Sequence, residues 1–402
     1  MPREQFRLLA GEELLRVYKP EGGTAVKVFC SVCGSSLFGG AWPDGDEVSV
    51  RFGSLDDDPQ IRPQFHTFVG SRPPWEDLPE DGLPQYEAGK LDEVERPAVT
   101  TWSVQLPLVG AGGEPVDLKR TLLSHGFVEL PPMRLDESAA TLEVTLLADG
   151  RSARTIEIAP GRRGHARLSV IGPAPSKRLA DELVARSRHV LGLDEDLSEF
   201  YELVQLDPDL SWAAEGAGRM VRSPTVFEDV VKTICTTNCA WSATRRMVDA
   251  LVRNLGEPAP GGRHAFPTPA AMAEADERFY KEVVRSGYRA PYFRALAAGE
   301  AEGRLELDSL LDPELSDDGV AARLLALPGV GPYATAQMMM LLGRYSRLIL
   351  DSWSRPKYAK VTGHDASDKM IERRFERYKQ YAGLAFWLYV TRDWVAEPAG
   401  IK

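Results

Sequence analysis

The first ninety residues alternate between apolar and polar side chains in short segments. Those segments, separated by Gly, Pro and Asp, are VKVFC, SSLFGG, EVSVRFGSL and HTFVG. A period of two is typical of strands that bury one face, so we expect small antiparallel strands from Phe6 to about Tyr86. A stretch rich in Pro and charge then predicts a linker over residues 84–98.

The segment from Trp102 to Pro173 mixes strand and helix patterns. It predicts a helix in DLKRTLLSHG and strands in WSVQLPLV, ATLEVTLL, ARTIEIA and ARLSVIG. The dipeptide Asp149-Gly150 separates two of these strands and is a strong hairpin signal. Together these patterns predict a small α+β layer.

After Pro175 the apolar residues recur every three or four positions almost to the end of the chain, as in RLADELVARSRHVLGL and TVFEDVVKTICTTNCAWSATRRMVDALVRNLG. This period predicts amphipathic helices. Pro224 is predicted to be a first-turn proline behind the N-cap Ser223. We therefore expect a multidomain chain with a β-rich unit over 1–95, an α+β layer over 98–200 and an all-α domain over 201–402.

Length and composition agree with two to three soluble globular domains, since the chain has 402 residues and is 43% hydrophobic. No apolar run of about eighteen residues occurs, and the N-terminus lacks the order of a signal peptide, so we expect a cytoplasmic protein without a membrane partner. Four cysteines are too few for a disulfide scaffold. Cys235 and Cys239, without a nearby His, are expected to be small packed residues.

The net charge of −11 is unevenly distributed. Residues 1–95 carry 9 Lys and Arg against 18 Asp and Glu, whereas the remainder carries 39 against 41. A nearly neutral remainder can still bind DNA if its basic residues share one face, but its overall charge does not favour a polyanionic partner.

The most informative segment is AARLLALPGVGPYATAQMMMLLGRYSRLILDSW, residues 321–353. It predicts a helix through Leu325, a tight turn at Pro328-Gly329-Val330-Gly331, and a second helix that opens at Pro332. Two glycines let the backbone approach a ligand, and the free N–H groups of a helix N-terminus suit a DNA phosphate. An ordinary turn between helices explains the turn residues equally well.

Asp351 follows Tyr333 by eighteen residues, at the end of the apolar run RLIL. The loop after the second helix can return the chain to the hairpin, which would place this carboxylate beside bound DNA. Cleavage of an N-glycosidic bond develops positive charge on the sugar, which a fixed anion stabilises. A helix cap or a surface residue is the alternative role for Asp351.

These residues resemble the hairpin and catalytic aspartate of the helix-hairpin-helix DNA glycosylase superfamily. Three further blocks, in order, resemble its 3-methyladenine DNA glycosylase II and 8-oxoguanine branches: SPTVFEDVVKTICTTN, SGYRAPYFRALA and YAGLAFWLYVTRDW. The similarity covers about residues 100–402. It implies an α+β layer before a helical glycosylase domain, and double-stranded DNA with a damaged base as partner of a monomeric protein associated with the nucleoid.

The resemblance assigns several residues. Tyr333 stands where bifunctional members carry a Schiff-base lysine, which implies hydrolysis without strand cleavage and without a cofactor. Asn238 matches the residue that fills the gap left by a flipped nucleotide, although a buried helix-capping Asn is the alternative. Phe386 replaces the glutamine that reads 8-oxoguanine, which favours an alkylated or otherwise damaged base in an aromatic pocket.

Further candidates follow from position and residue type. Trp241, Tyr292 and Trp353 are candidates for the same base pocket, although aromatic residues at helical spacing are also typical of a core. Gly329, Val330, Gly331, Tyr333, Arg355 and Lys357 are the candidate DNA contacts of the hairpin and of the residues after Asp351.

Cys30 and Cys33 form a CxxCG turn, which in zinc sites aims two thiolates at one metal ion. The surrounding segments resemble the second half of the glutathione-dependent formaldehyde-activating enzyme family, a zinc-binding β fold. That family's earlier cysteines have no counterpart in this chain. We therefore expect either a start upstream of Met1 or an incomplete zinc site in a unit kept for packing.

Three functions from different classes remain open. The first is a monofunctional DNA glycosylase of base excision repair. The second is a non-catalytic protein that binds damaged DNA through the same hairpin. The third is a zinc-dependent enzyme acting on small thiol adducts through the N-terminal unit.

Overall fold

The computed structural model describes residues 3, 6–19, 26–40, 42, 48–56, 65–67, 69, 72, 78–79, 83, 85–86, 99–148, 150 and 152–395. The chain divides into two compact units, Met1–Asp92 and Glu93–Lys402, and each is described by itself. Except for Gln85 and Tyr86, the linker predicted over 84–98 lies outside the described residues. Among the described residues, no helix is long and apolar enough to span a membrane.

The N-terminal unit contains the predicted antiparallel strands. Its sheet has the order β1 (Leu15–Tyr18), β2 (Val26–Cys30), β3 (Ser36–Gly40) and β4 (Val48–Val50). The core behind this sheet contains four buried residues, Val26, Val28, Phe38 and Val48. Beyond a 3₁₀ turn at Phe52–Ser54, β5 (His66–Thr67) pairs in parallel with β6 (Gln85–Tyr86), so the prediction of antiparallel strands is wrong for this last pair. So small a core supplies little hydrophobic stabilisation.

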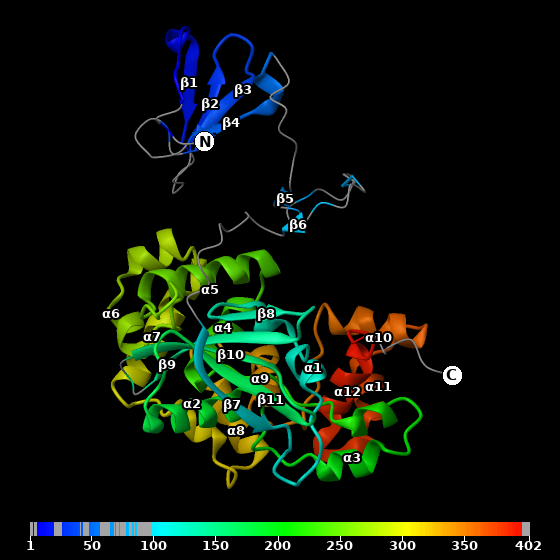
Figure 1. Cartoon of the computed structure of the whole chain (residues 1–402). Helices are drawn as coiled ribbons and strands as arrows, with labels where there is room; N and C mark the ends of the chain where they lie inside the picture. Colours follow the sequence, from blue (N-terminus) through cyan, green and yellow to red (C-terminus); the bar gives the residue numbers. More distant parts are fainter. Residues whose placement is uncertain are drawn as a thin grey trace. The chain divides into compact units, whose positions relative to one another are not determined.

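The second unit begins with an antiparallel sheet of five strands in the order β7-β11-β10-β9-β8 (Figure 1). Its strands are β7 (Val99–Pro107), β8 (Met133–Asp136), β9 (Thr141–Ala148), β10 (Ser152–Pro160) and β11 (His165–Ile171). The predicted β9–β10 hairpin is present, with Gly150 at φ +64° in its turn. Helix α1 (Leu118–Leu122) and the 3₁₀ turn Gly126–Glu129 connect β7 to β8.

Helices make up most of the remaining chain. They are α2 (Lys177–Val190), α3 (Ser198–Val204), α4 (Val226–Thr236), α5 (Trp241–Leu255), α6 (Pro269–Glu274), α7 (Ala290–Ala301), α8 (Asp317–Leu325), α9 (Pro332–Leu341), α10 (Ser354–Thr362), α11 (Asp368–Phe375) and α12 (Ala382–Thr391). Short turns lie at Ser211–Glu215, Phe279–Val283, Gly287–Arg289, Leu307–Leu311 and Glu376–Tyr381. Figure 1 shows α10, α11 and α12 grouped together at one side of this unit.

The start of α4 corrects one prediction. Thr225, not Ser223, is the N-cap, because its hydroxyl accepts a hydrogen bond from the Glu228 N–H. Pro224 therefore precedes the cap and is not in the first turn. Ser223 instead donates its N–H to the Asp229 carboxylate, which is buried.

The two largest hydrophobic cores of the described residues lie within the second unit, and polar contacts join the segments around them. One core lies against the sheet, and the other lies among the helices. Arg219 is fully buried in an ion pair with Glu114 and donates to the Gly192 carbonyl at 2.9 Å. Because removing one partner would leave a buried charge uncompensated, this pair fixes how the α+β layer meets the helices.

His125 makes a second buried connection between the same parts. Its Nδ1 accepts from the Phe127 N–H at 3.2 Å, so Nε2 carries the proton and donates to the Val221 carbonyl at 2.7 Å. Burial lowers the pKa of His125 to about 4, since the charged imidazolium would be desolvated. The folded protein therefore requires the neutral ring.

We expect the free energy of unfolding to fall as the pH drops from 6.5 towards 4. In this range His125 binds a proton in the unfolded chain but stays neutral in the folded protein. A shift of this size corresponds to about 3 kcal/mol. His125→Gln keeps a donor and an acceptor but does not titrate. Denaturant unfolding at several pH values should give a shallower dependence for this variant, and equal slopes would contradict the assignment. A residual slope is expected from His189, whose pKa burial also lowers to about 4.

Candidate active site

The predicted hairpin of two helices is present as α8, the turn 326–331 and α9. Gly329 has φ +80°, and a Cβ there would lie 2.7 Å from the ring of Tyr292, so both conformation and packing require glycine. Gly331 is the N-cap of α9, and a Cβ at this position would meet no atom within 4 Å. No side chain caps α9 among the described residues, so its first N–H groups face a surface that a ligand can approach.

Val330, which was a candidate DNA contact, does not contribute to that surface. Its side chain is buried in the helical core, and its N–H donates to the Leu327 carbonyl at 3.2 Å. Val330 therefore fixes the shape of the turn, while the glycines on either side are accessible.

Tyr333 connects the hairpin to the predicted catalytic residue. It is partly buried, and burial raises the pKa of its phenol, with a further contribution from the negative charge of Asp351. A hydrogen bond with the Thr236 side chain at the end of α4 acts in the opposite direction. Asp351 thus lies within electrostatic range of the Tyr333 side chain, in the first turn of α9.

Asp351 caps the N-terminus of α10. Its Oδ1 accepts from the N–H groups of Trp353 at 2.9 Å and Ser354 at 2.6 Å, and its own N–H donates to the Ser354 hydroxyl at 2.9 Å. The carboxylate is partly buried. Hydrogen bonds and a helix N-terminus stabilise its negative charge and fix its orientation. The bonds of the described residues use Oδ1, so Oδ2 can face a ligand.

Asn238 lies in the loop that interrupts the helical pattern between α4 and α5. It has φ +48°, is exposed, and donates from Nδ2 to the Tyr288 hydroxyl at 3.2 Å. The alternative of a buried helix-capping Asn is therefore wrong. An exposed polar side chain held on a constrained loop is suited to contact with a nucleic acid.

Arg289 supports this loop, a role that sequence reasoning missed. Its guanidinium is buried and donates to the carbonyls of Ile234 at 3.1 Å and of Thr237. It also lies over the ring of Tyr288, 4.6 Å from the centroid. The only sequence signal was its place in the block SGYRAPYFRALA, which assigns no partner.

Trp353 belongs to a cluster of three tryptophans beside Asp351. Its ring centroid lies 5.6 Å from those of Trp387 and Trp394, which are 5.8 Å from each other. Trp353 and Trp394 are 41% and 37% exposed, whereas Trp387 is 8% exposed and donates to the Ser124 carbonyl at 2.8 Å. Sequence reasoning missed Trp387 and Trp394, because helix docking alone determines which face of α12 meets Trp353.

The other aromatic candidates lie elsewhere. Phe386 is fully buried against Tyr358 and Phe375, so its ring cannot contact a base from solvent. We therefore exclude Phe386 from the base pocket. Tyr292 packs on Gly329 and supports the hairpin. Trp241 opens α5, donates to the Glu129 carboxylate at 3.1 Å and covers Gly126.

The two basic candidates of α10 are ion-paired. Arg355 donates to both oxygens of Asp368, from Nε at 2.7 Å and from Nη2 at 2.9 Å. The Lys357 ammonium lies 2.8 Å from the Asp393 carboxylate. Neither residue is therefore an uncompensated charge in the protein without DNA.

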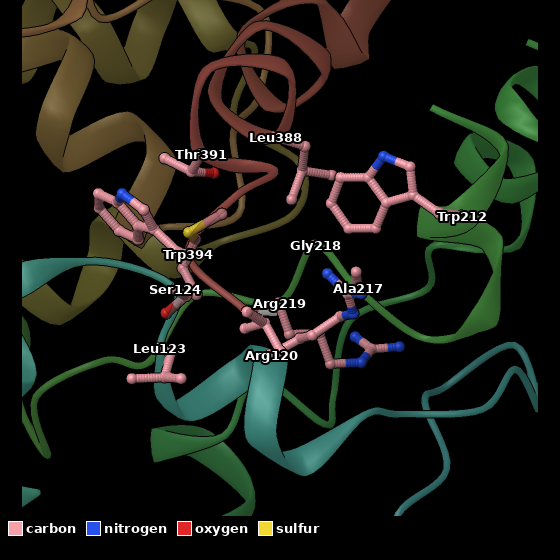
Figure 2. Close-up of a pocket in the computed structure, with 12 residues that line it drawn as sticks. Arg120, Leu123, Ser124, Trp212, Ala217, Gly218, Arg219, Leu388, Thr391 and Trp394 are labelled. Atoms are coloured by element: carbon pink, nitrogen blue, oxygen red, sulfur yellow. The ribbon is translucent and has the colours of Figure 1, made fainter. Parts of the chain in front are cut away.

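Two pockets of the second unit are lined by described residues other than Asp351. A pocket of about 20 Å³ has Trp212 and Trp394 on opposite sides (Figure 2). A cleft of about 500 Å³ lies between the loop after α2 and the residues after α9, where Arg222 pairs with Glu195 and Arg344 with Asp317. The smaller pocket adjoins the tryptophan cluster through Trp394, whereas the larger cleft is lined by four carboxylates and two guanidinium groups.

In the N-terminal unit, Cys30 ends β2 and Cys33 is exposed in the following turn, and both are free thiols. Within the described residues, no three His, Cys, Asp or Glu side chains lie close enough together to hold a metal ion. Two thiolates are half of a closed structural zinc site. The described residues therefore do not fit a complete zinc centre.

Comparison with protein families identifies a match to the glutathione-dependent formaldehyde-activating enzyme family over residues 1–71. A curated relative, "Putative DNA-3-methyladenine glycosylase YfjP" of Bacillus subtilis, is 25% identical over 42% of this chain and 60% of its own length. "Probable bifunctional transcriptional activator/DNA repair enzyme AlkA" of Mycobacterium tuberculosis is 30% identical over 40% of this chain and 32% of its own length. The chain thus spans less than two thirds of these relatives.

Among solved structures, the 3-methyladenine DNA-glycosylase from Archaeoglobus fulgidus superposes with a TM-score of 0.56 and 19% identity. The match covers 73% of this chain and 100% of that protein, and at this identity it shows a shared fold. These findings confirm both resemblances that the sequence suggested, one for each unit.

Glycines at the two turn positions should respond differently to the same substitution. Gly329→Ser should lower the free energy of unfolding by about 1–3 kcal/mol, because of its left-handed backbone and the contact with Tyr292. Gly331→Ser should change the free energy of unfolding by less than about 0.5 kcal/mol, because a Cβ at this position meets open space and serine is favoured at N-caps. Urea unfolding followed by circular dichroism measures both, and equal losses would contradict this account of the turn.

Proposed function

We propose that this protein is a monofunctional DNA glycosylase that hydrolyses the N-glycosidic bond of a flipped, damaged base. The observation that carries the proposal is that Asp351 lies within electrostatic range of Tyr333, which lies in the first turn of α9, directly after the α8–α9 turn, and precedes Asp351 by eighteen residues. The relatives named as DNA glycosylase and DNA repair enzyme support the reaction class.

DNA would be positioned by the hairpin. The N–H groups at the start of α9 would bind a phosphate of the lesion strand, and Gly331 allows the close approach that this needs. Asn238, exposed on the loop that Arg289 supports, would fill the space that the flipped nucleotide leaves in the duplex.

Asp351 would act on the sugar. As the base departs, positive charge develops on the deoxyribose, and a partly buried, oriented carboxylate stabilises that charge and directs a water molecule to the anomeric carbon. The base leaves with the bonding electrons and is protonated, and the water supplies the hydroxyl. This hydrolysis requires no cofactor from the protein.

The aromatic surface next to Asp351 favours an alkylated or similarly electron-poor base. Trp353 and Trp394 are 41% and 37% exposed and offer π faces, which attract a cationic or electron-poor ring by stacking. Trp353 lies two residues after Asp351, so a base stacked there would have its sugar near the carboxylate.

A non-catalytic binder of damaged DNA is the second candidate, because capping α10 is by itself a sufficient role for Asp351. Substitution by asparagine separates the two candidates. Asn is also a good N-cap residue, so it should keep the helix while removing the charge.

We expect Asp351→Asn to reduce base release from a panel of lesion-containing duplexes by at least about 100-fold, with unchanged thermal stability and DNA binding. Asp365→Asn, which removes an exposed charge from the loop that follows α10, is the matched control and should behave like the parent. If the parent binds these duplexes but releases no base, the protein is a binder. If Asp351→Asn retains full base release, Asp351 is not the catalytic carboxylate.

The phenol at Tyr333, in place of an amine, predicts the product. A phenol forms no Schiff base with the sugar, so the product strand should remain intact at an abasic site until it is treated with hot alkali. Gel analysis before and after alkali measures this. Borohydride should trap no covalent protein–DNA complex, and a trapped complex would show that another amine acts as nucleophile.

A further inference from the structure

The basic side chains at the start of α10 are held by carboxylates from two other segments. Asp368, the first residue of α11, forms a two-pronged pair with Arg355, and Asp393, which follows α12, pairs with Lys357. The side chains of Arg355 and Asp368 are each about half exposed, at 43% and 47%. This pair is thus open to a ligand from solvent. In the second pair Asp393 is 58% exposed and Lys357 only 17%, so a ligand reaches the ammonium mainly from the side of the carboxylate.

These pairs have the geometry of phosphate recognition. A guanidinium that donates two parallel hydrogen bonds to a carboxylate presents the same donors to the two free oxygens of a phosphodiester. The hydrogen bond with Asp368 raises the pKa of Arg355, and the negative charge of Asp351 adds a smaller contribution, so Arg355 lies within electrostatic range of Asp351. Arg355 and Lys357 both belong to the helix that Asp351 caps. The donors are therefore next to the residue proposed to act on the sugar.

We propose that Asp368 and Asp393 occupy a phosphate-binding surface, formed by Arg355 and Lys357, and that a DNA backbone phosphate displaces them. This inference rests on the proposed function and adds a control of affinity to it. An exposed ion pair contributes little to stability, so it can open without loss of the fold. The released carboxylates then lie near the DNA backbone and repel it.

This arrangement weakens binding to undamaged DNA. Each phosphate contact at this surface must first break an ion pair within the protein, so the affinity that comes from charge alone is reduced. A duplex that also places a flipped base against the tryptophan cluster gains stacking in addition. Because the carboxylates lower the affinity for every duplex, tight binding then requires the stacking that a flipped base supplies.

The test is a double-mutant cycle on binding to an undamaged duplex at low salt, measured by fluorescence anisotropy with the full-length chain. Asp368→Asn should bind about threefold to tenfold more tightly than the parent, and the gain should shrink as salt screens the charges. Asp365→Asn is the matched control, since it removes the same charge three residues away and forms no ion pair within the described part of the chain. It should gain clearly less.

The cycle then removes the donor. In an Arg355→Gln background, Asp368→Asn should no longer tighten binding, because its effect acts through Arg355. Asp393→Asn should behave likewise with Lys357→Gln. Thermal unfolding of each variant checks that the fold is retained.

Three results would overturn the inference: equal gains for Asp368→Asn and Asp365→Asn, a gain that persists without Arg355, or no duplex binding by any variant. The same preparations are assayed for base release from lesion DNA. Base release by the parent together with any of these results removes the inference and leaves the proposed function in place. If the parent protein releases no base from lesion DNA, the proposed function itself is wrong.

Discussion

Burial of α9 on every side is the constraint on which the rest of the second unit depends. Every residue from Ala334 to Leu341 is buried, so this helix can meet solvent only at its N-terminal end. That end carries the uncapped N–H groups and the glycine turn. A helix buried in this way is held at a fixed angle by the packing of its neighbours, and this packing also fixes the turn before it.

Stability and chemistry share the same groups around that helix. Asp351 caps α10 through Oδ1, so the orientation of its carboxylate is set by a bond that also stabilises the helix. Arg289 likewise satisfies the carbonyl groups at the end of α4 and thereby shapes the loop that presents Asn238. Groups that fold the protein therefore position the groups that would meet DNA, which is the preorganisation that catalysis requires.

Electrostatics explain how a nearly neutral unit can present a DNA-binding surface. The excess of acidic residues belongs to the first 95 positions, while the remainder is close to balance. In the second unit many basic side chains have carboxylate partners, from the buried Arg219–Glu114 pair to the exposed Arg355–Asp368 pair. Exposed pairs can exchange partners with a polyanion, whereas buried pairs are fixed parts of the structure.

The local elements of this protein could be predicted from its amino acids alone, whereas the partners of its site residues could not. Alternating strands, the turn at Gly150 and the glycine turn between α8 and α9 follow from side-chain period and backbone freedom within a few residues. The spacing of eighteen residues between Tyr333 and Asp351 also predicted that the chain returns close enough for the two side chains to interact electrostatically.

The contacts between distant helices could not be predicted in this way. Phe386 and Trp387 are adjacent and both aromatic, yet packing turns Phe386 into the core and Trp387 towards Trp353. The carboxylate partner of Arg355 lies thirteen residues away and that of Lys357 thirty-six. Contacts between distant segments depend on how whole helices dock, and no residue pattern within one helix specifies them.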